Sequence, residues 1–154
     1  MASPNQHDLL GVTAIAIGGR GLILRGPPGS GKSSLALALI DRGARLIGDD
    51  GVQVQALGDR LVAHPPPNIA GKLEIRNVGL VDLPPESAPI ALILELDDDP
   101  PRFRENADSI DLFGMKIPAI GFCPGEIAPA QRAEWALLVH GLAFQTDEAD
   151  EASG

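Results

Sequence analysis

One segment restricts the fold of this chain more than any other. Residues 26–33 read Gly-Pro-Pro-Gly-Ser-Gly-Lys-Ser, which is the Walker A pattern of a glycine, four free positions, Gly-Lys and a serine. The pattern binds phosphate where a strand enters the loop and a helix leaves it, because the N–H groups then converge on an anion at the helix N-terminus. Residues 22–25 are strand-like, and residues 32–42 are rich in the helix formers leucine and alanine. The sequence therefore predicts a loop that binds a nucleoside triphosphate or another polyphosphate.

The side chains at the end of this loop have separate expected tasks. Lys32 is placed to neutralise the β- and γ-phosphates, and the Ser33 hydroxyl is placed to ligate a Mg²⁺ ion that bridges them. The glycines allow the main chain to approach phosphate oxygens closely. The residues expected to contact the ligand are Gly26, Pro27, Pro28, Gly29, Ser30, Gly31, Lys32, Ser33 and Ser34.

Two adjacent acids, Asp49 and Asp50, follow a short strand predicted at residues 45–48. That strand comes directly after the helix of the loop, so a βαβ unit would put its carboxyl end beside the phosphate-binding loop. One carboxylate holding the metal is the ordinary arrangement, and a second one is then available to accept a proton from an attacking hydroxyl. The same pair followed by Gly51 also fits a plain turn between two strands. With the loop upstream, we favour a functional role.

The rest of the chain consists of short strands separated by glycine and proline turns. The segments that read as strands are residues 12–17, 22–25, 45–48, 52–57, 60–64, 79–83, 90–96, 109–113 and 115–117. The apolar run 90–96 fits a central strand. Helix 32–42 is nearly apolar all round and should be buried, and a second helix is expected at 129–143 after a first-turn proline. We therefore predict an α/β P-loop kinase domain with a mixed β-sheet and a buried P-loop helix.

The length of the chain places these elements in one domain. A chain of 154 residues leaves no room for two ordinary domains. We expect an N-terminal arm at residues 1–10, the P-loop catalytic domain at 11–144 and a disordered acidic tail at 145–154.

The composition excludes several classes of function. The formal net charge of −9 and the aromatic content of 3% argue against a nucleic-acid partner. The longest apolar stretch, 90–94, is much shorter than the roughly 20 residues of a membrane span. The single cysteine, Cys123, excludes an intrachain disulfide, and the first residues lack the pattern of a secretion signal. We therefore expect a cytoplasmic protein without a membrane role.

Three segments together resemble the catalytic domain of HPr kinase/phosphorylase, in the short form found in proteobacteria. They are the loop at 26–33, the segment Arg-Gly-Ala-Arg-Leu-Ile-Gly-Asp-Asp at 42–50 and the segment Leu-Glu-Ile-Arg-Asn-Val-Gly-Leu at 73–80, and the similarity runs over residues 11–138. The resemblance implies a fold akin to phosphoenolpyruvate carboxykinase and a bifunctional enzyme. Such an enzyme uses ATP and Mg²⁺ to phosphorylate a serine of the phosphocarrier protein HPr, and removes that phosphate by attack of inorganic phosphate to give pyrophosphate.

The resemblance also assigns roles to individual residues. It implies that Asp49 is the acid/base that deprotonates the serine in the kinase direction and protonates it in reverse. The implied catalytic set is Asp49, Asp50, Lys32 and Arg104, and the implied metal ligands are Ser33, Asp50 and Glu74. Glu74 and Arg76 match the family signature, which bears on the phosphorylase reaction and on subunit contacts. Without the resemblance, these two residues would form a surface ion pair on one face of a strand.

The resemblance further implies a homo-hexamer. If it forms, the apolar residues of the last helix are a subunit contact, and otherwise they are a packing face. These residues are Trp135, Leu137, Leu138 and Leu142.

Two other functions also fit the loop. Family members carry a histidine where this chain has residues 10–11, and His7 is the nearest histidine available to replace it. A nucleotide-sensing module that binds ATP without turnover is therefore one alternative. A small-molecule kinase is the other, although it would need phosphate-clamping arginines, and the segment after residue 97 offers only Arg102 and Arg104.

Overall fold

The computed structural model describes residues 6–67, 70–75, 77–97 and 107–144. Half of the described structure is strand and 17% is helix, so the chain is mostly β. The expected α/β class is therefore wrong. A strand, a loop and a helix in succession are typical of parallel α/β sheets, but here most strands pair with a sequence neighbour in antiparallel hairpins.

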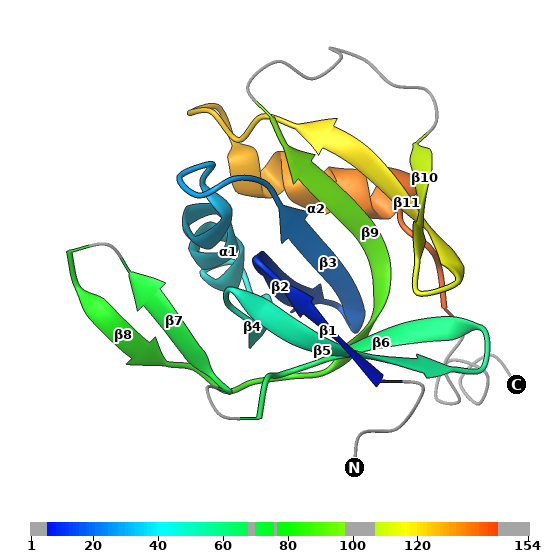
Figure 1. The fold of residues 1–154 in the computed structure, drawn as a ribbon. Helices are drawn as coiled ribbons and strands as arrows, with labels where there is room; N and C mark the ends of the chain where they lie inside the picture. The colour runs from blue at the N-terminus through cyan, green and yellow to red at the C-terminus, as the bar shows by residue number, and fades with distance from the viewer. Residues whose placement is uncertain (1–5, 68–69, 76, 98–106, 145–154) are drawn as a thin grey trace, which may run out of the picture.

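The described ranges contain eleven strands and two helices (Figure 1). The strands are β1 (Gln6–Leu10), β2 (Val12–Ile17), β3 (Arg20–Arg25), β4 (Arg45–Gly48), β5 (Gly51–Leu57), β6 (Arg60–His64), β7 (Lys72–Ile75), β8 (Gly79–Asp82), β9 (Ala88–Leu96), β10 (Asp108–Leu112) and β11 (Met115–Phe122). The helices are α1 (Lys32–Ile40) and α2 (Pro129–His140). Neither of these helices combines the length and the apolar character of a membrane span. The segment expected to be an arm contributes β1, which pairs with β5, and the expected tail lies outside the described residues.

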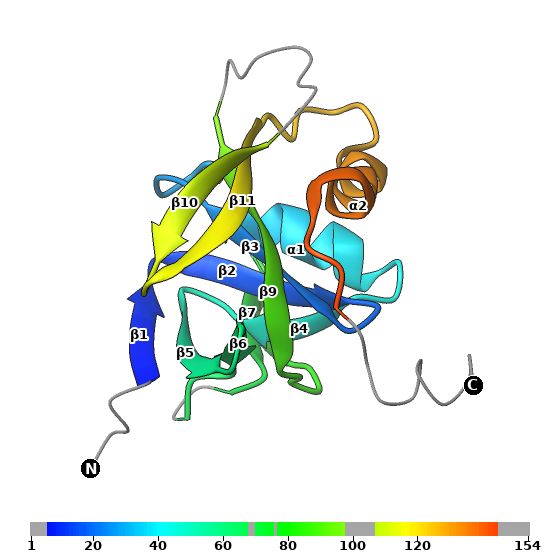
Figure 2. The same cartoon turned by 90° about the vertical axis from the view of Figure 1, so that its right-hand side faces the viewer.

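Nine of these strands form one sheet. Their order is β1-β5-β6-β9-β3-β2-β4, with β11 on β9 and β10 on β11. The parallel pairs of this sheet are those that β9 makes with β3 and β11, and the other described pairs are antiparallel. The start of β9 pairs with β6 and its end pairs with β11, so these two strands share one edge of β9. The sheet therefore curls into a half-barrel (Figure 2).

Alternate residues of the central strands face two different cores. Leu22 and Leu24 of β3 belong to the core that includes the helix residues Leu35 and Leu39, whereas Ile23 belongs to the core inside the curl. All five side chains are exposed by 2% or less. Full burial of such a side chain contributes about 1.5–3 kcal/mol. Because both faces are covered, the apolar run of β9 lies centrally, as its sequence predicts.

Strand β2 lies between β3 and β4, which the sequence did not predict. The expected βαβ unit would have put β3 and β4 side by side. Because both strands are antiparallel to β2, they run parallel to each other and end at the same edge of the sheet. Strand β2 begins at that edge, so its second residue, Thr13, lies between the end of β3 and the end of β4.

The β7–β8 hairpin is separate from the large sheet and projects beside α1 (Figure 1). The Leu83 N–H closes its base by donating to the Gly71 carbonyl at 2.7 Å, and Gly71 has a φ of +78° that favours glycine. Leu73 is fully buried against the core that contains α1. Because successive side chains of a strand alternate, Lys72 and Glu74 lie on the other face of the hairpin.

Candidate functional site

The loop between β3 and α1 has the conformation that the Walker A pattern requires. Gly29 and Gly31 have φ angles of +83° and +99°, in the left-handed region that favours glycine. Gly26 is also restricted, because a Cβ there would lie 3.1 Å from the Leu96 Cβ. Helix α1 begins at Lys32 and has no acid in its first turn, so nothing there opposes the positive end of the helix dipole. The loop is thus shaped for an anion.

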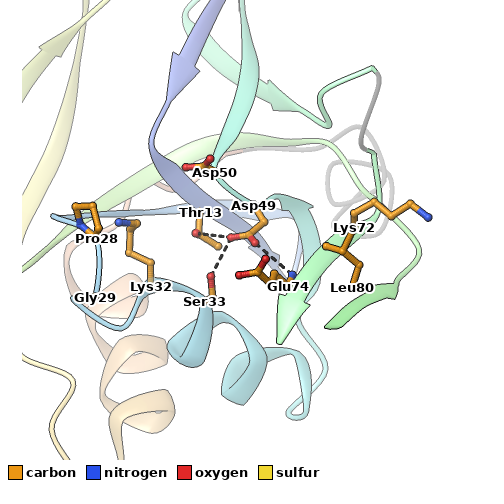
Figure 3. A pocket seen from close by; sticks show the side chains of 10 residues that line it. All are labelled: Thr13, Pro28, Gly29, Lys32, Ser33, Asp49, Asp50, Lys72, Glu74 and Leu80. Atoms are coloured by element: carbon orange, nitrogen blue, oxygen red, sulfur yellow. Dashed lines mark hydrogen bonds between the residues drawn. The ribbon is translucent and has the colours of Figure 1, made fainter. Parts of the chain in front are cut away.

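A cavity of about 550 Å³ lies beside this loop (Figure 3). Its lining comes from the loop and the start of α1, from β2, from the residues after β4 and from the β7–β8 hairpin. The lining residues are Thr13, Pro28, Gly29, Lys32, Ser33, Asp49, Asp50, Lys72, Glu74 and Leu80. The structure thus brings the loop, the two aspartates and Glu74 together.

Three of the lining residues were missed in the sequence. Lys72 is two residues from Glu74 on the same strand, and Leu80 is the cross-strand partner of Glu74, so alternation around Glu74 is a signal that identifies both. Thr13 is signalled only by being a hydroxyl in an otherwise apolar strand.

Asp49 is the centre of the hydrogen bonds in this cavity (Figure 3). Its Oδ1 accepts hydrogen bonds from Thr13 Oγ1 at 2.9 Å and from Ser33 Oγ at 3.0 Å. Its Oδ2 accepts a longer one from the Glu74 backbone N–H at 3.4 Å. The carboxylate therefore connects the large sheet, the first turn of α1 and the hairpin.

Asp50 lines the same cavity but is exposed. Its φ of +64° is left-handed, and its carbonyl accepts a hydrogen bond from the Gly11 N–H at 3.2 Å. Such a backbone costs an ordinary residue about 1–2 kcal/mol, and aspartate tolerates it better than most. Figure 3 shows its side chain set apart from Ser33 and Asp49. Within the part of the chain that the structure describes, the Asp50 carboxylate has no hydrogen bond or ion pair, so it is available to a ligand.

Two lysines line the cavity, and they differ in their partners. Lys32 Nζ donates to the carbonyl oxygens of Gly26 at 2.6 Å and of Pro27 at 3.2 Å. Lys72 instead forms an ion pair with Asp82 across the hairpin. A polyphosphate would have to replace only neutral carbonyl partners to bind Lys32. Lys32 is therefore the better placed of the two cations.

Some predicted ligand contacts of the loop lie outside this cavity. Ser34 is exposed on α1 and does not line it. Pro27 and Ser30 line an adjoining hollow of about 340 Å³ instead, together with Asp97, and this hollow shares Pro28 and Gly29 with the cavity.

Of the remaining predicted residues, one is described and the others are not. His7 is not among the lining residues, and it stacks on Phe113 with the ring centroids 4.2 Å apart. Arg76 and Arg104 lie outside the described residues, as does Arg102.

The oxygen ligands of the cavity fit a hard divalent cation that is bound together with phosphates. Among the described residues, no three His, Cys, Asp or Glu side chains cluster closely enough to hold a metal. Mg²⁺ usually takes one or two carboxylates and completes its coordination with phosphate oxygens and water. Ser33, Asp49 and Glu74 supply oxygen atoms next to the phosphate-binding loop. This donor set fits Mg²⁺ with a polyphosphate better than a self-contained metal site.

Together, the fold and the cavity define a class of protein, in which a Walker A loop and a pair of aspartates meet at one edge of a curled, mostly antiparallel sheet. Comparison with known families agrees. The model of the HPr Serine kinase C-terminal domain matches residues 4–86, which is more than half of the 154 residues. The chain belongs to this family. The matched part includes the loop, both aspartates and the β7–β8 hairpin.

Curated relatives carry the name HPr kinase/phosphorylase. The protein of Clostridium tetani is 41% identical over 66 residues, that of Shouchella clausii 40% over 84 residues and that of Clostridium perfringens strain SM101 32% over 112 residues. These matches cover 43%, 51% and 64% of this chain, but only 22%, 27% and 36% of the relatives. The chain thus matches about a third or less of the length of these relatives.

A solved structure shares the fold. The HPr(Ser) kinase/phosphatase from Coxiella burnetii superposes with a TM-score of 0.71 at 24% sequence identity. The superposition covers 83% of this chain and 87% of the other. The chain is therefore related to the HPr kinase/phosphorylase enzymes in sequence, and its fold is that of one of them.

Proposed function

We propose that this chain is an HPr kinase/phosphorylase, which transfers the γ-phosphate of ATP to a serine of HPr and removes it again by phosphorolysis. Its relationship to enzymes of that name supports the proposal. The observation that carries it is the hydrogen bond from Ser33 to Asp49 at 3.0 Å, because it joins the phosphate-binding loop to the aspartate pair in one cavity.

The residues of the loop account for binding of the nucleotide. The N–H groups at the start of α1 bind the phosphates, and Lys32 exchanges its carbonyl partners for phosphate oxygens. Ser33, Asp49 and Glu74 would hold Mg²⁺, which neutralises charge on the transferred phosphoryl group when it is bound.

The geometry supports an exchange of the roles expected for the two aspartates. The Asp49 carboxylate already accepts hydrogen bonds from two hydroxyls, one of them on Ser33, which suits a residue that organises the metal side. Asp50 is exposed and unpaired among the described residues, which suits a residue that meets the substrate. In this proposal, Asp50 accepts the proton of the substrate serine. In the phosphorylase reaction, Asp50 gives a proton to the serine oxygen while inorganic phosphate takes the phosphoryl group, so the same residue acts as a base in one reaction and as an acid in the other.

Incubation with γ-labelled ATP, Mg²⁺ and purified HPr tests the activity. We expect label on the serine of HPr, and its release as labelled pyrophosphate when inorganic phosphate is added. HPr with that serine replaced by alanine is the matched control and should take up no label. Tight ATP binding without any transfer to HPr would contradict the proposal.

A nucleotide-sensing module without turnover is the second candidate. One observation favours it, since no histidine of the described residues lines the cavity. The same assay separates the two functions, because a sensor would bind ATP and leave HPr unlabelled.

We also propose that the chain forms a homo-hexamer. On α2, Leu137 is buried, whereas Trp135, Leu138 and Val139 are 64%, 61% and 66% exposed. Apolar side chains exposed together on one helix favour contact with another protein surface. Light scattering after size-exclusion chromatography should give six times the chain mass of 16.0 kDa. A Trp135→Glu variant should give a smaller mass, and a monomeric wild-type chain would contradict this proposal.

A further inference from the structure

A buried hydroxyl in the large sheet, that of Thr13, donates to Asp49, and the function proposed above assigns it no task of its own. Thr13 is 1% exposed, and it is the single buried polar residue in the part of the chain that the structure describes. Val12, Ala14 and Ile15 beside it are buried and apolar. Valine has nearly the same shape without the hydroxyl, whose burial costs free energy unless it is hydrogen-bonded. Packing alone therefore does not account for a threonine here.

An irregularity in the pairing of β2 with β4 brings Asp49 opposite this hydroxyl. The register of the two strands shifts by one residue between Ala14 and Ile15, so Ile47 is an extra residue of β4 at this point. Beyond the shift, Ala14 pairs with Gly48, where a regular ladder would pair it with Ile47, and Asp49 directly follows Gly48. The result is the hydrogen bond of 2.9 Å from Thr13 Oγ1 to Asp49 Oδ1.

The second hydrogen bond to Asp49 Oδ1 comes from Ser33. Thr13 belongs to a strand with hydrogen-bonded neighbours on both sides, so the sheet fixes its position. Asp49 follows the last residue of β4, and Ser33 is in the first turn of α1. A hydroxyl has one hydrogen and two acceptor lone pairs. While Ser33 donates its hydrogen to Asp49, both lone pairs remain available to a cation.

We propose that Thr13 is a positioning residue for the cation site. Its hydroxyl holds the Asp49 carboxylate in the orientation in which Asp49 accepts the hydrogen of Ser33. The lone pairs of Ser33 are thereby directed toward a divalent cation that accompanies a nucleotide. For the identity of that ligand, ATP with Mg²⁺, this inference rests on the proposed function. Hydrogen-bond partners that act behind a metal ligand typically change metal affinity by about 10- to 100-fold.

Two variants separate positioning from packing. Thr13→Val keeps the volume of the side chain and removes the hydroxyl, whereas Thr13→Ser keeps the hydroxyl and removes a methyl group from the core. If Thr13 positions Asp49, Thr13→Val is the more harmful variant for Mg²⁺-dependent binding. If Thr13 serves only to fill space in the core, Thr13→Ser weakens binding more than Thr13→Val does, because the lost methyl group leaves a void in the core. The two roles therefore predict opposite rankings.

Calorimetric titration with ATP, once with Mg²⁺ and once with EDTA, measures the ATP affinity of the wild type and of the two Thr13 variants. We expect Thr13→Val to weaken binding in Mg²⁺ by about tenfold or more and to leave binding in EDTA unchanged. Thr13→Ser should remain close to the wild type in both. Equal losses with Mg²⁺ and EDTA, or a larger loss for Thr13→Ser than for Thr13→Val, would overturn the positioning role.

The titration requires neither HPr nor turnover, so its outcome is separate from that of the labelling assay. A chain that shows the expected ranking but does not label HPr would refute the kinase and support the role of Thr13. A chain that labels HPr while Thr13→Val keeps its full Mg²⁺-dependent affinity would refute the role of Thr13 alone. A wild-type chain that binds no ATP would overturn both.

Discussion

The floor of the cavity and the hairpin beside it are built in opposite ways. The floor consists of Thr13, Ser33 and Asp49, which belong to the large sheet and α1 or directly follow a strand of that sheet. The hairpin contributes Glu74 and Leu80 from a two-stranded sheet that, among the described residues, pairs with no strand of the large one. Among the described residues, one long hydrogen bond, from the Glu74 N–H to Asp49, joins the two regions inside the cavity.

The floor and the hairpin also differ in how far their side chains are exposed to solvent. Thr13 in the floor is 1% exposed, whereas Val78 and Leu80 of the hairpin are 71% and 69% exposed. Phosphoryl transfer depends on accurate placement of the reacting groups, which a floor held by a sheet supplies. Exposed apolar side chains on a projecting hairpin suit contact with a protein substrate. For the proposed function, we expect the floor to position the reacting groups and the exposed apolar residues of the hairpin, which also carries Glu74, to contact the protein substrate.

The largest expected effect belongs to the two aspartates, of which Asp49 is in the floor and Asp50 lies beside it. Asp50→Asn should lower transfer from ATP to HPr by about 10²–10⁴-fold and leave ATP binding nearly unchanged, because it removes the proton acceptor. Single-turnover labelling and calorimetry measure the two quantities. Asp49→Asn is the matched variant, and it should weaken Mg²⁺-dependent binding as well as transfer. Loss of transfer with intact binding in Asp49→Asn, and not in Asp50→Asn, would restore the roles first expected from the sequence.

The next largest effect is expected on ATP affinity, where the two lysines of the cavity should differ. Lys32→Ala should weaken ATP binding by about 10- to 100-fold, which corresponds to the loss of charged hydrogen bonds to phosphate. Lys72→Ala is the control on the hairpin, and it should change ATP affinity little because Lys72 is paired with Asp82. Calorimetry with ATP and Mg²⁺ measures both. A larger loss in Lys72→Ala would mean that the hairpin, and not the loop, holds the phosphates.

A smaller effect is expected from the apolar side of the hairpin. Leu80→Ser should raise the KM for HPr by up to about tenfold, as expected for the loss of one partly buried apolar contact, and should raise the KM for ATP by a smaller factor because Leu80 also lines the cavity. Ile127 is 81% exposed and does not line the cavity, so Ile127→Ser is the matched control and should change neither constant. An unchanged KM for HPr in Leu80→Ser would remove the hairpin from substrate recognition.

The smallest effect is expected outside both regions. Arg42 beyond the end of α1 donates to Glu134 of α2 through Nε at 3.0 Å and Nη2 at 2.9 Å. The hydrogen bonds and the charge of Glu134 raise the pKa of the Arg42 guanidinium, so the stabilisation that this shift represents is lost when the pH rises through that pKa. Glu134→Gln should lower the urea midpoint slightly, because the pair is exposed. A change in ATP or HPr kinetics would show that the helices are coupled to the cavity.

The sequence predicts the parts of the site that depend on neighbours along the chain. The loop at 26–33, the start of α1 and the position of Asp49 and Asp50 after a short strand follow from local patterns, because glycines, helix formers and strand ends act over a few residues. The same local pattern misled the prediction of fold class. A strand, loop and helix are shared by parallel α/β proteins, whereas hairpin pairing makes this sheet mostly antiparallel.

The contact between Thr13 and Asp49 could not be predicted from the sequence. The contact requires that β2 enter between β3 and β4 and that β4 carry an extra residue. Both depend on pairing between strands far apart along the chain, for which a single sequence has no local signal. Alternation around Glu74, in contrast, is local, and it identifies Lys72 and Leu80 once the hairpin is recognised.

The central claim is that one cavity holds a metal-bound triphosphate between the loop and the two aspartates. A crystal structure of the chain with Mg²⁺ and a non-hydrolysable ATP analogue tests it most directly. We predict the phosphates at the start of α1, the cation at Ser33, Asp49 still bonded to Thr13, and Asp50 facing the terminal phosphate. A nucleotide in the hollow lined by Asp97, or a cation held without Ser33 and Asp49, would contradict the account.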